Sequence, residues 1–301
     1  MKNKVLIFGF GSIGIRHANL LRRLKKVSNV LIFSSRVNKK FNSTNRIFDI
    51  LKFNPDYILV CSETSQHLRT IKIIEKNFKN KTVLVEKPLF HKSIRFNFKN
   101  NKYYVGYNLR FHPVIKFLKR QIKKNKIFSI SVFCNSFLPK WRKNIDYFNS
   151  YSSSKVRGGG VLLDLSHEID YLQWLFGKIN RIEYKKIKTV SNLKIKSEDM
   201  VQVIGKIKNI NFYLNLTYFS RHEERRIIID SNKETIVGDL INYNIKIIDN
   251  KNLKKIKFKN TKNQTYIDQH LAILNNQPKI LCNIKDAKNT LSFIERLKGK
   301  I

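Results

Sequence analysis

A glycine-rich motif near the start of the chain restricts its fold more than any other feature. Residues 5–8 (VLIF) form a short apolar run, which is typical of a parallel strand buried on both faces. Gly9, Gly11 and Gly14 follow with the spacing G-x-G-x-x-G, and apolar residues at helical spacing come next. This order of strand, glycine turn and helix predicts the start of a doubly wound α/β sheet.

Each glycine has its own task in such a turn. Gly9 permits the tight bend, Gly11 lets a phosphate approach the backbone, and Gly14 lets the helix pack closely on the strand. The amide groups of Ser12 and Ile13, at the positive end of the helix dipole, would hold a pyrophosphate. An ordinary glycine turn is the alternative, but the flanking pattern favours dinucleotide binding.

The second predicted strand, residues 30–33, ends at Ser34, Ser35 and Arg36. Sites specific for NAD usually place an Asp or Glu here, on the ribose 2′-hydroxyl. Two hydroxyls and a guanidinium suit a 2′-phosphate instead, so the sequence favours NADP over strict NAD and leaves dual use open. Alternatively, Arg36 stacks on the adenine or lies in solvent.

The pattern of predicted elements changes near residue 112. Strands at 57–61 and 82–85, with a helix near 66–75 between them, continue the parallel Rossmann sheet. After Pro113, alternating polarity predicts six or more strands of a largely antiparallel open sheet. The sequence therefore predicts a Rossmann domain at 1–112 and a C-terminal α+β domain at 113–301.

Composition and charge exclude several classes of protein. The net charge of +39 is spread through nearly every segment, so a bias of the whole chain explains it better than a specific nucleic-acid site. No apolar run approaches the roughly 20 residues of a membrane span, and none forms an export signal. We expect a cytoplasmic protein without a disulfide framework or a metal site, because the cysteines are odd in number and far apart: Cys61, Cys134 and Cys282.

Five motifs in a fixed order give the chain a specific family resemblance. It resembles the glucose–fructose oxidoreductase, inositol dehydrogenase and rhizopine-catabolism family (Gfo/Idh/MocA). The motifs are GFGSIGIRH at 9–17, TSQH at 64–67, EKP at 86–88, VGYNLRFHP at 105–113 and GGGVLLDLSHEID at 158–170.

The resemblance implies a cofactor site with Lys87 beside the nicotinamide and the reacting carbon. A partly desolvated Lys can have its pKa lowered enough to share the removal of a hydroxyl proton. Glu86 would orient Lys87 or touch the cofactor, and Thr64 and His67 would contact the cofactor. The bond before Pro88 is often cis in relatives. An exposed salt bridge between Glu86 and Lys87 is the alternative.

The resemblance also assigns Asp164 and His167 to the substrate hydroxyl and its proton. The sequence predicts one helix after residues 158–160, with both side chains on its polar face. Familiar members place the His four positions after the Asp, whereas here it lies three positions after the Asp. The helix is then shifted, or Asp170 steadies His167, or His167 is a surface residue.

Further substrate contacts are predicted before this helix. The segment 137–156 has weak periodicity and many aromatic and polar groups, which is typical of a loop over a sugar-like substrate. It could equally mediate subunit contacts, and we expect a homo-oligomer formed through the C-terminal sheet. The predicted substrate-binding residues are Arg110, Trp141, Arg142 and Tyr151.

Together these features predict hydride transfer between NAD(P) and a carbinol or ketone carbon of a sugar, sugar acid, cyclitol or nucleotide sugar. The long central motif resembles members associated with surface-sugar synthesis. Three alternatives stay open: an imine or tetrapyrrole reductase, a non-catalytic dinucleotide-binding regulator, and a polyanion-binding protein.

Overall fold

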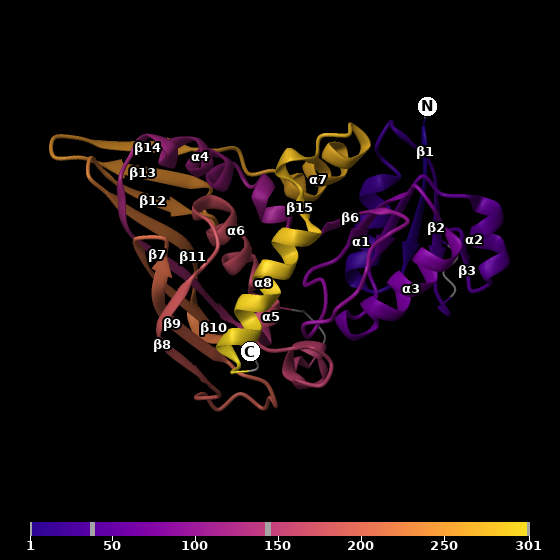
Figure 1. Ribbon diagram of the computed structural model, residues 1–301, viewed down its shortest axis with the longest axis horizontal. Helices are drawn as coiled ribbons and strands as arrows, with labels where there is room; N and C mark the ends of the chain where they lie inside the picture. Colours follow the sequence, from indigo (N-terminus) through magenta and orange to yellow (C-terminus); the bar gives the residue numbers. More distant parts are fainter. Residues whose placement is uncertain (1, 37–39, 142–145, 300–301) are drawn as a thin grey trace. The chain divides into compact units, whose positions relative to one another are not determined.

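The computed structural model describes residues 2–36, 40–141 and 146–299 (Figure 1). Backbone contacts divide the chain into two compact units. The first comprises Met1–Asn108 and Asn263–Leu291, and the second Leu109–Lys262 and Ser292–Ile301. The functional domains 1–112 and 113–301 stay a prediction.

A seven-stranded sheet with the order β15-β6-β5-β4-β1-β2-β3 forms the centre of the first unit. All its strand pairs are parallel except β15 with β6. The strands are β1 (Asn3–Phe8), β2 (Val27–Phe33), β3 (Ser43–Thr44), β4 (Tyr57–Val60), β5 (Thr82–Val85), β6 (Lys102–Val105) and β15 (Cys282–Asn283). The helices are α1 (Ser12–Leu21), α2 (Ile47–Phe53), α3 (His67–Asn77), α7 (Gln264–Leu274) and most of α8 (Ile284–Leu297).

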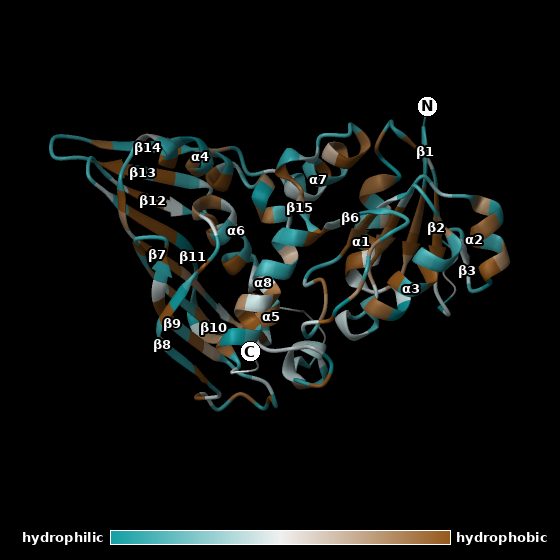
Figure 2. Cartoon of the chain, in the orientation of Figure 1, coloured by the Kyte–Doolittle hydropathy of each residue, from teal (hydrophilic) through white to brown (hydrophobic). Residues whose placement is uncertain are grey.

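The central strands are apolar on both faces, as a parallel sheet between helices requires. Residues 5–8 of β1 and all of β4 are at most 3% exposed, and β1 is largely brown in Figure 2. The chain order reverses between β1 and β4, and ligands of open α/β sheets bind outside the carboxyl ends of the strands at such a point. The predicted Rossmann sheet is confirmed.

The second unit contains an eight-stranded sheet with the order β14-β13-β12-β11-β7-β10-β9-β8. Only the β10–β7 pair is parallel, so the predicted open, largely antiparallel sheet is also confirmed. The strands are β7 (Ile127–Phe137), β8 (Arg181–Lys188), β9 (Met200–Ile207), β10 (Ile210–Thr217), β11 (Phe219–Ser231), β12 (Thr235–Asp239), β13 (Asn244–Ile248) and β14 (Leu253–Lys257). The helices are α4 (Pro113–Gln121), α5 (Val161–Asp164) and α6 (Ser166–Phe176).

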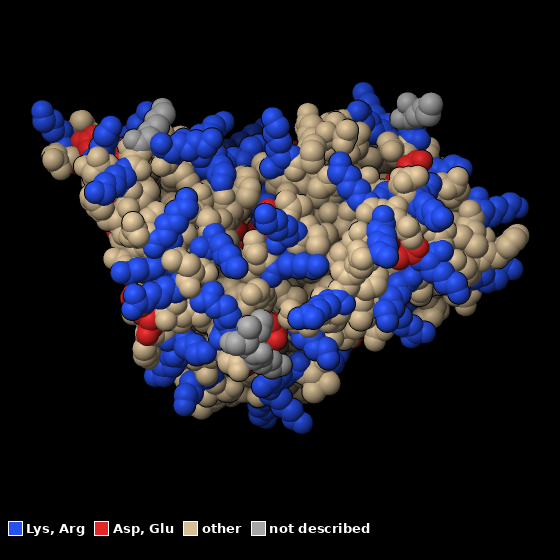
Figure 3. Space-filling view, viewed as in Figure 1, with Lys and Arg blue, Asp and Glu red and all other residues tan. Residues whose placement is uncertain are grey.

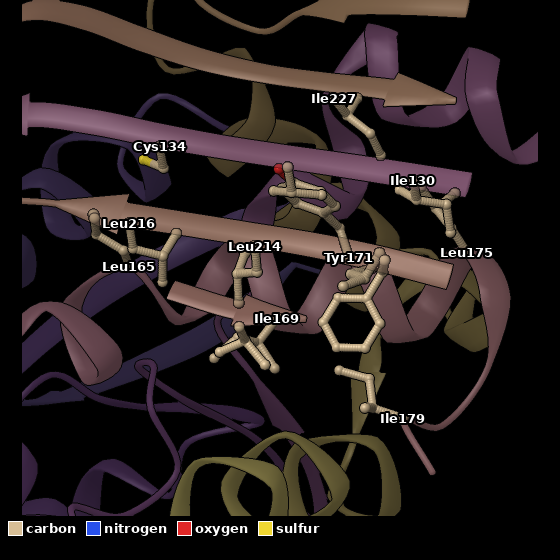
Figure 4. Packing of buried hydrophobic residues seen from close by; sticks show 14 of the residues in the cluster. Ile130, Cys134, Leu165, Ile169, Tyr171, Leu175, Ile179, Leu214, Leu216 and Ile227 are labelled. Carbon is tan, nitrogen blue, oxygen red and sulfur yellow. The ribbon is translucent and has the colours of Figure 1, made fainter. Parts of the chain in front are cut away.

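Helix α6 packs on one face of this sheet. Alternate residues of the strands point toward it, because successive side chains of a strand lie on opposite faces. Figure 4 shows Ile130 and Leu214 on the strands, with Ile169 and Tyr171 of α6 in the same cluster, and all four are at most 1% exposed. This core fixes the helix that carries His167.

Lys and Arg residues occur in nearly every segment of the sequence. On the face drawn in Figure 3, Lys and Arg side chains are spread over the whole visible surface. No helix in the described part of the chain has the length and apolar character needed to cross a membrane. Nor do three or more His, Cys, Asp or Glu side chains among the described residues form a group that could hold a metal ion.

Candidate active site

The three motif glycines have different surroundings in the turn between β1 and α1. A Cβ on Gly9 would lie 2.7 Å from the Ser62 nitrogen, and Gly9 has a φ of +102° that disfavours any side chain. A Cβ on Gly14 would lie 2.3 Å from the Gly9 oxygen. A Cβ on Gly11 would meet no atom within 4 Å. The fold therefore requires Gly9 and Gly14, whereas Gly11 faces open space.

Gly11 is also the N-cap of α1, and no side chain caps this helix. The backbone of Gly11 is extended, with φ −81° and ψ −176°. Ser12 and Ile13 form the first turn of the helix, where amide groups point away from the helix body. An anion in the open space at Gly11 would thus meet unscreened backbone donors and the positive end of the helix dipole.

The end of β2 presents hydroxyl and guanidinium groups. The Ser34 amide donates to the Thr44 carbonyl at 2.9 Å, and the Ser34 Oγ accepts from the Arg36 amide at 3.0 Å. Ser35 and Arg36 are exposed. Ser34 is therefore part of a local turn that leaves the Arg36 side chain at the surface.

His67 links two loops at the carboxyl edge of the sheet. Its Nδ1 lies 3.1 Å from the Pro88 and Leu89 carbonyls, and its Nε2 lies 3.1 Å from the Ser62 carbonyl. The ring is 1% exposed, and burial lowers the pKa of His67. Thr64, half-buried, begins the turn before it. These contacts favour a role for His67 in holding the segment that follows Lys87.

Glu86 and Lys87 follow β5 directly, and the Lys87–Pro88 bond is cis, as the resemblance implied. The Glu86 Oε2 accepts from the Lys87 amide at 3.2 Å. Its Oε1 lies 2.8 Å from the Nε2 of His17 on α1, and the Glu86 side chain is 12% exposed. The Lys87 side chain is half-buried. The carboxylate therefore has a buried partner that reasoning from the sequence did not assign.

Two more residues of the first unit continue this row of contacts. His17 Nδ1 lies 2.8 Å from His270 Nε2, and His270 Nδ1 lies 3.0 Å from the Tyr57 hydroxyl. His17 closes the glycine motif and could have been found there. His270 lies on α7, and no local pattern marks its position.

In the second unit, the helix predicted to carry Asp164 and His167 is interrupted. Leu165, with φ −95° and ψ 26°, separates α5 from α6. Asp164 lies before this break and His167 after it, so the expected i, i+3 relation on one straight helix is wrong. Asp164 is 5% exposed, and its Oδ2 accepts a hydrogen bond from the Tyr218 hydroxyl with 2.6 Å between the two oxygens. His167 is half-buried.

Arg110 and Asp170 form a buried ion pair. The Arg110 Nε donates to Asp170 Oδ2 at 2.9 Å and its Nη2 to Oδ1 at 2.7 Å, and both side chains are 2% exposed. The Arg110 guanidinium also lies over the Trp174 ring. These contacts favour a structural role for Arg110 over a direct substrate contact. They also identify Asp170 as an ion-pair partner of Arg110.

The segment 137–156, which was predicted to cover the substrate, contributes one aromatic ring to the surroundings of Asp164. Trp141, half-buried, meets the Tyr218 ring edge-on with 5.1 Å between centroids. Tyr218 thus contacts both Trp141 and Asp164, and reasoning from the sequence missed it. Tyr151 begins a short turn and is half-buried. Arg142 lies outside the described residues.

Comparisons with known proteins agree with this fold. Residues 115–237 match the sequence model of the GFO/IDH/MocA C-terminal domain. In a search of curated proteins, no sequence matches the chain.

Solved structures match over the whole chain at low identity. UDP-N-acetylglucosamine 3-dehydrogenase GnnA from Acidithiobacillus ferrooxidans has 15% identity and a TM-score of 0.78, covering 100% of this chain and 98% of that one. Levoglucosan dehydrogenase in complex with NADH has 14% identity and a TM-score of 0.82, covering 100% and 97%. Myo-inositol 2-dehydrogenase from Lactobacillus plantarum has 14% identity and a TM-score of 0.77, also covering 100% and 97%. Identities of 14–15% with TM-scores of 0.77–0.82 show that these proteins and this chain share a fold.

The fold and the glycine turn define the chain as a two-unit α/β protein with a Rossmann sheet. It contains a Gfo/Idh/MocA C-terminal domain and has the fold of the oxidoreductases of that family, so the resemblance predicted from the five motifs is confirmed.

Proposed function

We propose that the protein is an NAD(P)-dependent oxidoreductase that transfers a hydride to or from a carbinol or ketone carbon of a sugar, sugar acid, cyclitol or nucleotide sugar. The observation that carries the proposal is the open space at Gly11, next to the uncapped start of α1. A turn that served packing alone would not need a glycine there. The fold-level neighbours, which include sugar and cyclitol dehydrogenases, support the same class.

The residues of the first unit fit a bound dinucleotide. Gly9 to Gly14 and the amides of Ser12 and Ile13 would hold the pyrophosphate. When bound, the nicotinamide would accept or supply the hydride. Lys87 would hold or release the hydroxyl proton at its Nζ, and Glu86 would keep the Lys87 segment in place through the Lys87 amide.

Asp164 and His167 of the second unit are proposed to hold the substrate hydroxyl and share its proton. Trp141, Arg142 and Tyr151 are proposed to contact the substrate. The Tyr218 hydroxyl, which donates to Asp164, would keep that carboxylate in one orientation. UDP-N-acetylglucosamine, which GnnA is named for, is one sugar nucleotide to test early. The proposed link to surface-sugar synthesis rests on the resemblance of the long central motif.

The proposal favours NADP at the end of β2. Arg36 is exposed beside the Ser34 and Ser35 hydroxyls, and no carboxylate stands among these three residues. An exposed guanidinium can pair with a 2′-phosphate. Arg36→Ala is expected to weaken NADPH binding by roughly tenfold and NADH binding little, as measured by nicotinamide fluorescence. An equal loss for both cofactors would contradict the preference.

A regulator that binds a dinucleotide without turnover is the second candidate. The burial of Asp164 against Tyr218 favours it, because a carboxylate already held by a protein hydroxyl has less capacity for a substrate. Turnover separates the two candidates. The purified protein should enhance NADPH or NADH fluorescence, and a screen of polyols and sugar nucleotides should produce or consume reduced nicotinamide at 340 nm.

Three outcomes of the screen and of a salt titration of binding would count against the proposal. The absence of fluorescence enhancement with both cofactors would reject dinucleotide binding. Enhancement without turnover of any substrate would favour the regulator. Binding that collapses between about 50 and 200 mM salt would instead indicate a polyanion-binding protein.

We also propose that the protein is a cytoplasmic homo-oligomer. The three cysteines are buried free thiols, which suits a reducing compartment. Tyr184, Ile204 and Tyr213 lie in register across β8, β9 and β10, and the first two are 50% and 43% exposed. Sedimentation of the wild type and of Tyr184→Lys with Ile204→Lys tests whether this row lies in a subunit interface.

A further inference from the structure

Four side chains of the first unit form an unbroken line of hydrogen bonds. They come from β4, α7, α1 and the end of β5, in the order Tyr57, His270, His17 and Glu86. The three donor–acceptor distances are 3.0, 2.8 and 2.8 Å. Both histidines are fully buried and Tyr57 is 1% exposed. With water excluded, these polar groups must satisfy one another.

The Tyr57 hydroxyl sets the direction of the line. Burial raises the pKa of Tyr57, so its hydroxyl keeps the proton. In the described part of the chain, His270 Nδ1 is the one hydrogen-bond partner of this hydroxyl. The hydroxyl must therefore donate and His270 Nδ1 must accept.

The remaining protons follow from this first step. Burial lowers the pKa of His270, so this ring is neutral and, with its Nδ1 accepting, carries its single proton on Nε2. That proton is donated to His17 Nδ1. His17 then carries a proton on Nε2 and donates it to Glu86 Oε1. Each donor meets an acceptor only when Glu86 is a carboxylate.

The backbone around Glu86 is shaped to this arrangement. A Cβ on Gly106 would lie 2.9 Å from Glu86 Oε1, so the glycine leaves room for the carboxylate at the end of β6. The other oxygen, Oε2, accepts from the Lys87 amide. Both oxygens of Glu86 therefore have fixed donors, one from α1 and one from Lys87 itself.

We infer that Tyr57, His270 and His17 are positioning residues that hold Glu86 as an oriented carboxylate beside Lys87. The inference rests on the proposed function. His17 lies on α1, the helix whose first turn would hold the pyrophosphate. One rigid helix thus connects the phosphate end of the proposed cofactor site to the carboxylate that precedes Lys87.

The direction of the line can be tested without turnover. Nitrogen-15 NMR of the histidine rings distinguishes the two neutral tautomers, and the variants His17→Asn and His270→Asn assign the signals. At pH 7 both rings should be neutral with the proton on Nε2. A proton on Nδ1 of either ring in the wild type would overturn the inference.

Tyr57→Phe removes the obligatory donor and one oxygen atom. Without it, His270 can carry its proton on either nitrogen, so the spectrum should change to a mixture of tautomers. Tyr103→Phe is a matched control, because it removes another buried hydroxyl of the same sheet, one that donates to Glu75 at 2.9 Å. Unchanged tautomers in Tyr57→Phe, or an equal change in Tyr103→Phe, would contradict the proposed direction.

The catalytic consequence is tested by pH profiles. Tyr57→Phe should lower kcat roughly tenfold with little change in the KM for the cofactor. The acid limb of kcat should move to higher pH by about one unit, because a line without its obligatory donor takes up a proton more readily. Tyr103→Phe should leave the profile unchanged, and identical profiles for the two variants would refute the positioning role.

The NMR test of the tautomers and the turnover test can fail independently of each other. Absence of wild-type turnover would reject the proposed function and with it the catalytic half of this inference. Reversed tautomers in an active enzyme would reject the proposed direction of the hydrogen bonds, and with it the positioning role, and would leave the proposed function intact.

Discussion

Gly11→Asp should separate the stability of the protein from its proposed cofactor binding. Gly11 has the extended backbone of an N-cap, which any residue adopts, and a Cβ there meets no atom within 4 Å. Asp is among the preferred N-cap residues because its carboxylate accepts from amides of the first turn. Helix α1 has no side-chain cap at present. The substitution therefore supplies an interaction that the helix lacks.

The expected magnitudes have opposite signs. A cap and a favourable charge at the positive end of the dipole together stabilise by about 0.5–1 kcal/mol, which raises Tm by about 1–3 °C for a chain of this size. The same carboxylate would lie against the pyrophosphate. Two like charges about 4 Å apart near a protein surface repel by about 4 kcal/mol, which weakens binding roughly a thousandfold.

Thermal unfolding and nicotinamide fluorescence measure the two effects on the same samples. Gly14→Ala is the contrasting variant, because its Cβ would lie 2.3 Å from the Gly9 oxygen and must displace the helix. It should lower Tm and weaken binding together. If Gly11→Asp binds NADPH or NADH as the wild type does, or loses Tm as Gly14→Ala does, the reasoning about this turn is refuted.

Three further predictions test the chemistry and the buried charges. Lys87→Ala should lower turnover at least about a hundredfold with little change in cofactor affinity, and undiminished turnover would remove Lys87 from the mechanism. Arg110→Met leaves the buried Asp170 carboxylate without the Arg110 guanidinium, so urea unfolding should show a loss of about 3–5 kcal/mol, most of which the added change Asp170→Leu restores. Burial, with a smaller contribution from Arg225, lowers the pKa of His112 from 6.5 to about 4, so the unfolded chain binds the proton first and stability falls as pH drops through this range. His112→Asn should remove about 2–3 kcal/mol of the stability difference between pH 7 and pH 4.5, and an unchanged difference would show that His112 is not responsible.

Local patterns predicted most of the first sheet because its signals are short in range. Residues 5–8 and the glycines after them specify strand, turn and helix within a dozen positions, and the structure places all three there. The pairing of β15 with this sheet could not be predicted from a local pattern. Strand β15 has two residues, too few for any periodicity, and its pairing with β6 spans more than 170 positions.

Polar groups in the second unit were harder to interpret from the sequence. The apolar stripe of α6 predicts one buried face, and its opposite side was expected to face a ligand. In the structure Glu168 and Tyr171 are also fully buried, because Arg225 of β11 forms two hydrogen bonds with the Glu168 carboxylate. A helix covered on several sides has no single polar face. Which of its polar residues have protein partners depends on strands more than 50 residues away.

The buried acids carry more information than the net charge does. The chain has only 21 Asp and Glu against 60 Lys and Arg. Exposed positions can take Lys freely. Lys cannot replace a buried carboxylate that accepts hydrogen bonds from fixed donors. The ammonium group would face those donors in an interior that does not screen the charge. Glu86, Asp164, Glu168, Asp170 and Asp199 are all such acceptors, at most 12% exposed. Four of them lie in the motifs at 86–88 and 158–170. These four acids therefore lie in the same segments to which the proposed reaction assigns its residues.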